Sequence, residues 1–233
     1  SSLFYGTIQS ALFTLLAVYA TSMNFTILEI SIVTFLLAVS GAIAQFPIGK
    51  ISDMYDRRKV IVFSTFGAAI FSIFAILVSR QMYLPGSLAT SKTWFYIFFI
   101  LFSFCSLPMF SLILAHTNDY ISKDKFVAAG AGLQFAFGLG AMSGPFLCSI
   151  FMDLVGSNGF FVFLFFFHCI IGFFGIYRMK VRQSVDNPDS QFVAMPQTIT
   201  PAGIELNPTT EHIEEPYSDC LLYTSPSPRD SCA

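Results

Sequence analysis

Six long runs of apolar residues, separated by short polar turns, constrain the fold of this chain more than any other feature. A helix needs about 20 mostly apolar residues to cross the hydrocarbon core of a bilayer. The runs cover approximately residues 3–20, 26–48, 59–79, 94–115, 126–151 and 160–177. Turn-forming residues mark several junctions, for example residues 84–87 and 156–159. The sequence therefore predicts an all-α membrane protein with six transmembrane helices.

The composition agrees with this class and excludes others. Hydrophobic residues make up 55% of the chain, charged residues make up only 11%, and there are 29 Phe, whereas a soluble domain has about 25% charged residues. Residues 1–182 hold eleven Lys or Arg and six Asp or Glu, and residues 183–233 hold one and eight. The total charge of −2 thus combines a basic membrane body with an acidic tail, and nothing in it supports binding to nucleic acid.

The distribution of basic residues between the loops predicts how the chain lies in the membrane, because short cytoplasmic loops are enriched in Lys and Arg. Nine basic residues follow the second, fourth and sixth runs, namely Lys50, Arg57, Arg58, Lys59, Lys123, Lys125, Arg178, Lys180 and Arg182. The opposite side has two, Arg80 and Lys92. We therefore expect both ends of the chain to be cytoplasmic.

The two ends of the chain differ from the membrane body. The chain opens at Ser1 without an initiator Met, so we expect a fragment that starts inside or just before a helix. Residues 183–219 are acidic and rich in Pro, and we expect a mobile cytoplasmic tail because such a segment has little apolar area to bury. Residues 220–233 resemble read-through of a sequencing adapter, so we expect them to be non-native.

A short charged loop between the second and third runs is the main candidate for function. Gly49 permits close approach of two helix ends, Asp53 can face the positive end of a neighbouring helix, and Arg57 and Arg58 offer planar donors to carboxylates. Such a cluster can hold a gate closed and release it. The alternative is that the basic residues only fix the topology, as any cytoplasmic loop can.

The same loop resembles the cytoplasmic signature of the major facilitator superfamily, which reads approximately Gly-x-Leu-Ala-Asp-Arg-x-Gly-Arg-Arg. Gly49, Asp53, Arg57 and Arg58 match it, while Met54 stands in place of a basic residue and Asp56 in place of Gly. The flanking segments 44–49 and 115–119 are similar to the carboxy-terminal half of bacterial drug- or sugar-efflux-type permeases. The resemblance implies that residues 1–182 form helices 7–12, one half of that fold.

The resemblance also implies a function. It predicts a secondary carrier in the bacterial inner membrane that moves a small solute across the lipid bilayer by alternating access, with a missing amino-terminal six-helix half as its partner. The alternative is a membrane sensor or scaffold that does not transport and whose acidic tail binds a cytoplasmic partner.

The fifth run contains a stripe of small residues that ends in a proline. Gly132, Gly140, Gly144 and Pro145 belong to this stripe, which is smooth enough for close contact between helix backbones. The Gly-x-x-x-Gly-Pro ending resembles a motif of the fifth or eleventh helix of the superfamily. Static helix packing explains the stripe equally well.

Few polar residues lie within the runs, and each is a candidate for the transport path because polar groups are costly in lipid. Gln45 and Gln134 can contact a solute or bond to a neighbouring helix. His168 can act as a proton-linked switch, although a neutral packing role is commoner for a lone His among aromatic residues. His116, Asn118 and Asp119 end the fourth run and form either a polar cluster at the gate or a hydrated helix end.

Motifs for catalysis or metal binding are missing from the sequence. There is no Gly-rich phosphate loop, no H-E-x-x-H helix and no G-x-S-x-G elbow, so we expect no enzymatic activity and no cofactor. The five Cys form no C-x-x-C pair, so we expect free thiols and no metal site.

Overall fold

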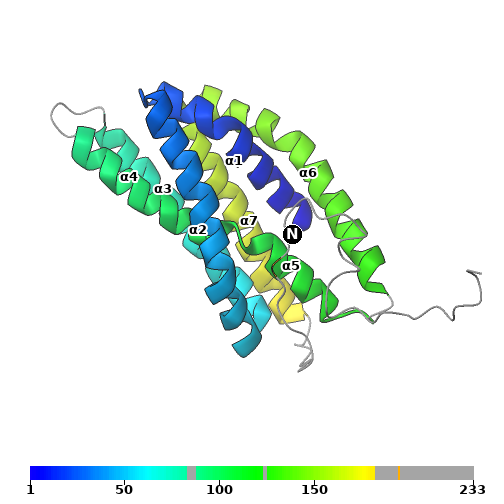
Figure 1. Ribbon diagram of the computed structural model, residues 1–233. Helices are drawn as coiled ribbons and strands as arrows, with labels where there is room; N and C mark the ends of the chain where they lie inside the picture. Colours follow the sequence, from blue (N-terminus) through cyan, green and yellow to red (C-terminus); the bar gives the residue numbers. More distant parts are fainter. Residues whose placement is uncertain (83–87, 123–124, 182–193, 195–233) are drawn as a thin grey trace, which may run out of the picture.

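A computed structural model of the chain describes residues 1–82, 88–122, 125–181 and 194. These residues form α-helices and no strands. The helices are α1 (Ser2–Ser22), α2 (Ile27–Met54), α3 (Arg57–Gln81), α4 (Leu88–Ser106), α5 (Met109–Asn118), α6 (Phe126–Val155) and α7 (Gly159–Val181). They lie side by side as a single bundle (Figure 1). The predicted tail at 183–219 and the segment 220–233 lie outside the described residues, apart from Ala194.

Among the described residues, six segments are long and apolar enough to cross a membrane, which confirms the predicted number and the all-α membrane class. The prediction of one continuous helix at 94–115 is wrong in detail, because the fourth segment consists of α4 and α5. The two helices are separated by Leu107 and Pro108. Pro108 is the N-cap residue of α5, a position where its missing N–H costs no hydrogen bond within that helix.

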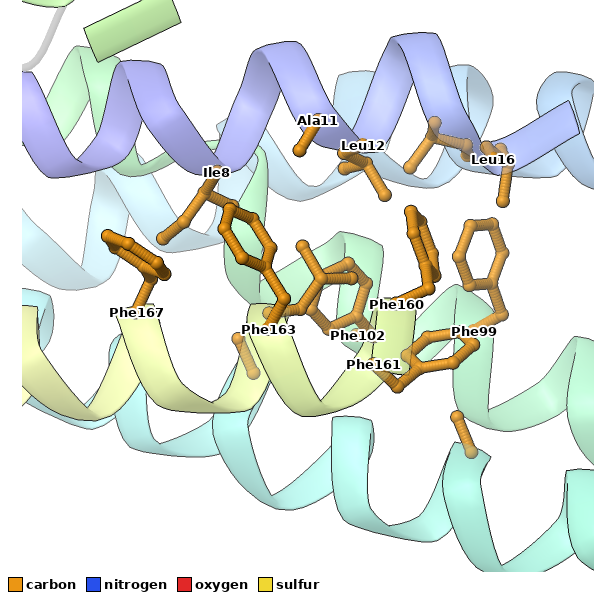
Figure 2. Close-up of a cluster of buried hydrophobic side chains, with 14 of the residues drawn as sticks. Ile8, Ala11, Leu12, Leu16, Phe99, Phe102, Phe160, Phe161, Phe163 and Phe167 are labelled. Atoms are coloured by element: carbon orange, nitrogen blue, oxygen red, sulfur yellow. The ribbon is translucent and has the colours of Figure 1, made fainter. Parts of the chain in front are cut away.

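The core of the bundle is aromatic and lies between α1, α4 and α7 (Figure 2). Ile8 and Leu12 of α1 point toward Phe160, Phe163 and Phe167 of α7, and each of these five residues is at most 8% exposed. Phe163 and Phe167, one turn apart on α7, have ring centroids 4.6 Å apart. The Phe-rich sixth run thus forms the central packing helix of the bundle.

Helix α1 lies along α6 at very short range because both helices carry small residues at their contact. A Cβ atom at Gly140 would collide with the backbone of Leu3, and one at Gly144 would collide with the backbone of Thr7. A Cβ at Gly132 would meet nothing within 4 Å among the described residues. The small stripe is therefore a backbone contact at two of its three glycines, and Pro145 lies within the uninterrupted helix α6.

Helices α2 and α6 are the least buried of the six spans. Large apolar side chains on both of them point away from the bundle, including Phe35 and Phe46 on α2 and Phe135 and Phe146 on α6, each at least 65% exposed. These two helices present the broadest uncovered apolar faces of the described chain.

Candidate gating site

Arg57 holds three helices together at one end of the bundle. Its Nη2 lies 2.7 Å from Asp53 Oδ1 at the end of α2, and its Nη1 lies 2.9 Å from Asp119 Oδ1 at the end of α5. Only 7% of Arg57 is exposed. Removing one partner of a buried ion pair is strongly destabilising, so this arginine fixes the ends of α2 and α5 relative to α3.

The local sequence explains how Arg57 reaches Asp53 across a helix boundary. Helix α2 ends at Met54, and after the two residues Tyr55 and Asp56 the chain starts α3 at Arg57. Although Asp53 and Arg57 belong to different helices, this tight turn brings their side chains into contact. The four-residue spacing of Asp and Arg in the signature therefore suits an ion pair across this turn.

Asp56, which stands in place of the signature Gly, has two roles in the structure. Its carboxylate accepts a hydrogen bond from the backbone N–H of Arg58 and so caps the amino end of α3. It also accepts bonds from Arg58 Nε and Nη2, at 3.0 and 2.7 Å. These hydrogen bonds hold the pKa of the Asp56 carboxyl below its usual range. The departure from the signature thus adds a third ion pair beside the two that Arg57 forms.

The other polar residues at the end of α5 lie close to this ion-pair cluster. The rings of His116 and Tyr120 meet edge to face, with centroids 5.1 Å apart. Only 8% of Asn118 is exposed, and its Oδ1 accepts no hydrogen bond from the described residues. The structure therefore brings Asp119 to the charged loop and places His116 and Asn118 beside it.

A groove of about 460 Å³ runs along α2 toward the same cluster, and most of its wall is apolar. Gln45, Gly49 and Asp53 follow each other at four-residue spacing along it, and the other lining residues are Ala42, Phe46, Lys50 and Ala194. Residues four apart lie on one face of a helix. This face of α2 therefore combines a candidate solute contact with two residues of the charged loop.

A comparison with protein families identifies the group to which this fold and loop belong. The family model described as Major Facilitator Superfamily matches residues 1–210. The chain belongs to the Major Facilitator Superfamily. The resemblance carried by Gly49, Asp53, Arg57 and Arg58 therefore led to the correct superfamily.

The curated relatives are superfamily transporters whose own names describe them as uncharacterized. One from Yersinia enterocolitica is 26% identical over 190 residues, which are 82% of this chain and 44% of the relative. YfkF of Bacillus subtilis is 26% identical over 165 residues, 69% of this chain and 38% of the relative. This chain therefore spans less than half the length of the superfamily members it matches. No solved structure gives a significant match.

His168 lies deep in this superfamily bundle as a neutral, fully bonded side chain. Its Nδ1 is 2.7 Å from the carbonyl oxygen of Leu164, which can only accept, so Nδ1 carries the proton. Nε2 then accepts from Ser106 Oγ at 3.0 Å, and the ring is completely buried. This geometry supports the packing interpretation of His168 over a proton switch. Gln134, the remaining candidate, lies half-buried on α6.

Two polar residues near the helix break were not among the predicted sites. The hydroxyl of Tyr5 lies 3.2 Å from the carbonyl oxygen of Ser106 and 3.0 Å from that of Leu107. Gln9, one turn further along α1, is 1% exposed, and neither polar atom of its amide has a partner among the described residues. The signal that could have found Tyr5 is Pro108, because a proline within an apolar run leaves carbonyl groups that need donors. Nothing in the sequence singles out Gln9.

Proposed function

We propose that this chain is half of a secondary carrier, with the Asp53–Arg57–Asp119 cluster as its cytoplasmic gate. A carrier that rocks between two states needs contacts that hold one state and can be broken to reach the other. Ion pairs at a partly hydrated helix end suit this role, because water can replace each partner. The observation that carries the proposal is Arg57, which is buried and shared between carboxylates of two helices.

The uncovered faces of α2 and α6 support the second part of the proposal, a missing amino-terminal half. An apolar face in a membrane is compatible with lipid, but the groove on α2 also exposes Gln45 and Asp53 along the same helix. Polar groups facing lipid are costly. A partner half that covers this groove, or a water-filled path between the halves, removes that cost.

Direction, orientation and solute class also belong to the proposal. The excess of Lys and Arg on the side that holds Arg57 supports a cytoplasmic position for the gate and for both ends of the chain. The resemblance to efflux-type permeases supports export from a bacterial cell across the inner membrane. The solute is small, and Gln45 offers it one hydrogen-bonding amide in a groove whose wall is otherwise mostly apolar.

The proposal is tested in a longer protein assembled from the upstream coding sequence, which we expect to encode six further apolar spans in frame. A single cysteine replaces Ala42 in the groove, and the native Cys residues are changed to Ser. We expect slow labelling of this cysteine by a water-soluble maleimide in the closed state. Arg57→Lys should raise the labelling rate about tenfold, because Lys cannot bridge two carboxylates as a planar guanidinium does.

The matched control is Lys59→Gln, which removes an exposed basic residue of the same loop that forms no ion pair among the described residues. It should leave the labelling rate unchanged. Equal acceleration by both variants would show that the loop acts only through its total charge. An upstream coding sequence without apolar spans would contradict the proposal that this chain is half of a carrier.

A further inference from the structure

Gln9 of α1 is the most deeply buried amide side chain among the residues that the structure describes. It is 1% exposed, and neither Nε2 nor Oε1 has a hydrogen-bond partner among those residues. Burying an amide without partners is costly, and the large majority of buried polar side-chain atoms in folded proteins are hydrogen-bonded. The amide of Gln9 therefore requires a bound molecule that can both donate and accept a hydrogen bond.

Tyr5 shows what lies next to this amide. It is one turn before Gln9 on the same face of α1. Its hydroxyl is 3.2 Å from the carbonyl oxygen of Ser106 and 3.0 Å from that of Leu107, at the break between α4 and α5. Side chains of a helix lean toward its amino end, so the side chain of Gln9 leans back over the turn that holds Tyr5. The amide therefore lies near the break.

The direction of the helices places the last turn of α4 opposite Gln9. Ser2 at the start of α1 and His116 near the end of α5 line one cavity, so both lie at the gate end of the bundle. Helix α1 thus runs antiparallel to the span formed by α4 and α5. One turn along α1 from Tyr5, the opposite residues are those just before Ser106. Figure 2 agrees, because it shows Phe102 of α4 in the same side-chain cluster as Ile8 of α1.

The break leaves backbone groups of both helices without their usual partners. Pro108 has no N–H to donate to the carbonyl oxygen of Phe104, four residues earlier in α4. Helix α5 begins at Met109 without a side-chain cap, and the first N–H groups of a helix have no partner within it. Met109 and Phe110 are at most 2% exposed. The break therefore adds buried acceptors and donors to those of Gln9.

We propose that a water molecule is bound between α1 and the α4–α5 break, held by the amide of Gln9. Water fits these groups because it donates and accepts, and a buried water typically makes about three hydrogen bonds. The hydroxyl oxygen of Tyr5 and the carbonyl oxygen of Phe104 are its further partners. No charged side chain lies among residues 5–12 or 99–115, so the site does not suit an ion.

This water gives Gln9 a positioning role at the gate. Its hydrogen bonds join α1 to the break and so help to set the angle at which α5 leaves α4. Helix α5 leads to Asp119, whose Oδ1 lies 2.9 Å from Arg57 Nη1. The angle at the break therefore determines whether this ion pair forms. Gln9 acts through the backbone of α5 and, being buried, is not itself a contact for the solute.

The direct test is NMR of the whole chain in detergent, labelled with ¹⁵N at the Gln side chains and with no solute added. We expect rotating-frame cross-relaxation between water and the Nε2 protons of Gln9, opposite in sign to chemical exchange. The signal is assigned by its loss in Gln9→Met. Gln81, which is exposed on α3, is the control and should show chemical exchange alone. Absence of the water signal at Gln9 would overturn the proposal.

A second test uses the sign of a change in melting temperature. Methionine is close to glutamine in size and has no amide. Gln9→Met should lower the melting temperature by about 3 °C, because the break loses its water-mediated hydrogen bonds. An amide without any ligand predicts a rise instead, since the variant then removes an unpaired polar group. A rise would contradict the water site. Gln45→Met, half-buried on α2, is the matched control and should cause a change below about 1 °C.

Two further readouts test the shared site and the positioning role. If Tyr5 and Gln9 bind the same water, the double variant Tyr5→Phe with Gln9→Met should lose less than the sum of the two single losses. Strictly additive losses would overturn the shared site. The ¹⁵N signal of Arg57 Nε should shift in Gln9→Met and stay in place in Gln45→Met. An unchanged signal in Gln9→Met would overturn the positioning role.

Discussion

Replacing Asp119 with Asn should destabilise the bundle more than the same change at Asp53, the other carboxylate that binds Arg57. Arg57 would remain buried with Asp53 as its carboxylate in the cluster, and the side chain of Asp53 is 33% exposed whereas that of Asp119 is 11% exposed. Breaking a buried ion pair costs about 3–5 kcal/mol. Because Asp53 still compensates part of the charge, we expect a loss of about 2 kcal/mol in the free energy of unfolding.

This loss can be measured as a change in melting temperature. For a chain of about 150–250 residues, 1 kcal/mol corresponds to roughly 2–4 °C, so Asp119→Asn should lower the melting temperature by about 4–8 °C. The assay is thermal unfolding in detergent, followed by a thiol-reactive dye that labels Cys148, which is completely buried in the folded protein. The other four cysteines, Cys105, Cys169, Cys220 and Cys232, are replaced by Ser so that they do not contribute to the signal.

Two comparisons make this result specific to the ion-pair cluster. Asp53→Asn should cost about 1 kcal/mol, since a half-exposed pair is screened by water, and Lys59→Gln should cost nothing measurable. We therefore predict that the loss of unfolding free energy is largest for Asp119→Asn, smaller for Asp53→Asn and negligible for Lys59→Gln. If Asp53→Asn is as damaging as Asp119→Asn, then the burial of Asp119 does not determine its contribution and the reasoning is refuted.

Three further predictions concern the packing of the bundle. Gly140→Val should cost about 2–3 kcal/mol by forcing α1 away from α6, measured by the same dye assay. Tyr5→Phe should cost about 1–2 kcal/mol, because it leaves carbonyl groups at the helix break without their donor. Ser106→Ala should cost about 1 kcal/mol by removing the donor to His168. This last change should also speed hydrogen exchange of the imidazole.

The variants of Gly140 and Tyr5 each have a matched control on the same chain. Gly132→Val makes the same change where a Cβ would meet nothing within 4 Å among the described residues, and it should cost less than about 1 kcal/mol. Tyr55→Phe removes the hydroxyl of a tyrosine that is 66% exposed and should be neutral. A loss at Gly132 equal to that at Gly140 would show that helix propensity, and not the contact with α1, sets the cost.

The sequence predicted the spans and the family because both depend on local patterns. Apolar runs of sufficient length must be helices in a membrane, and the spacing of Asp53 and Arg57 across a two-residue turn is readable without a structure. The break at Pro108 was missed because the run of apolar residues continues through it, and hydropathy carries no information about hydrogen bonds. Gln9 was missed for a related reason, since a single amide in an apolar run has the same pattern whether or not it finds a partner.

The contact between Arg57 and Asp119 could be anticipated only as a shared end of the bundle. The predicted topology places both residues on the same side of the membrane, because the second and fourth runs both end on that side. The sequence does not say that the side chains are 2.9 Å apart, since that distance depends on how α5 is tilted after the break. The part of the site that lies within one turn was therefore predictable, and the part that joins distant helices was not.

The ion pairs at the two ends of α2 indicate how this helix moves. At the gate end Asp53 binds Arg57 of α3. At the other end Glu29 Oε1 lies 2.7 Å from Lys92 Nζ of α4, and that ammonium also lies 4.9 Å from the ring centroid of Phe25. Both contacts favour one position of α2 within its own bundle. In the carrier that we propose, the uncovered face of α2 therefore moves together with this bundle, and the proposed gate opens by separation of the two halves rather than by displacement of one helix.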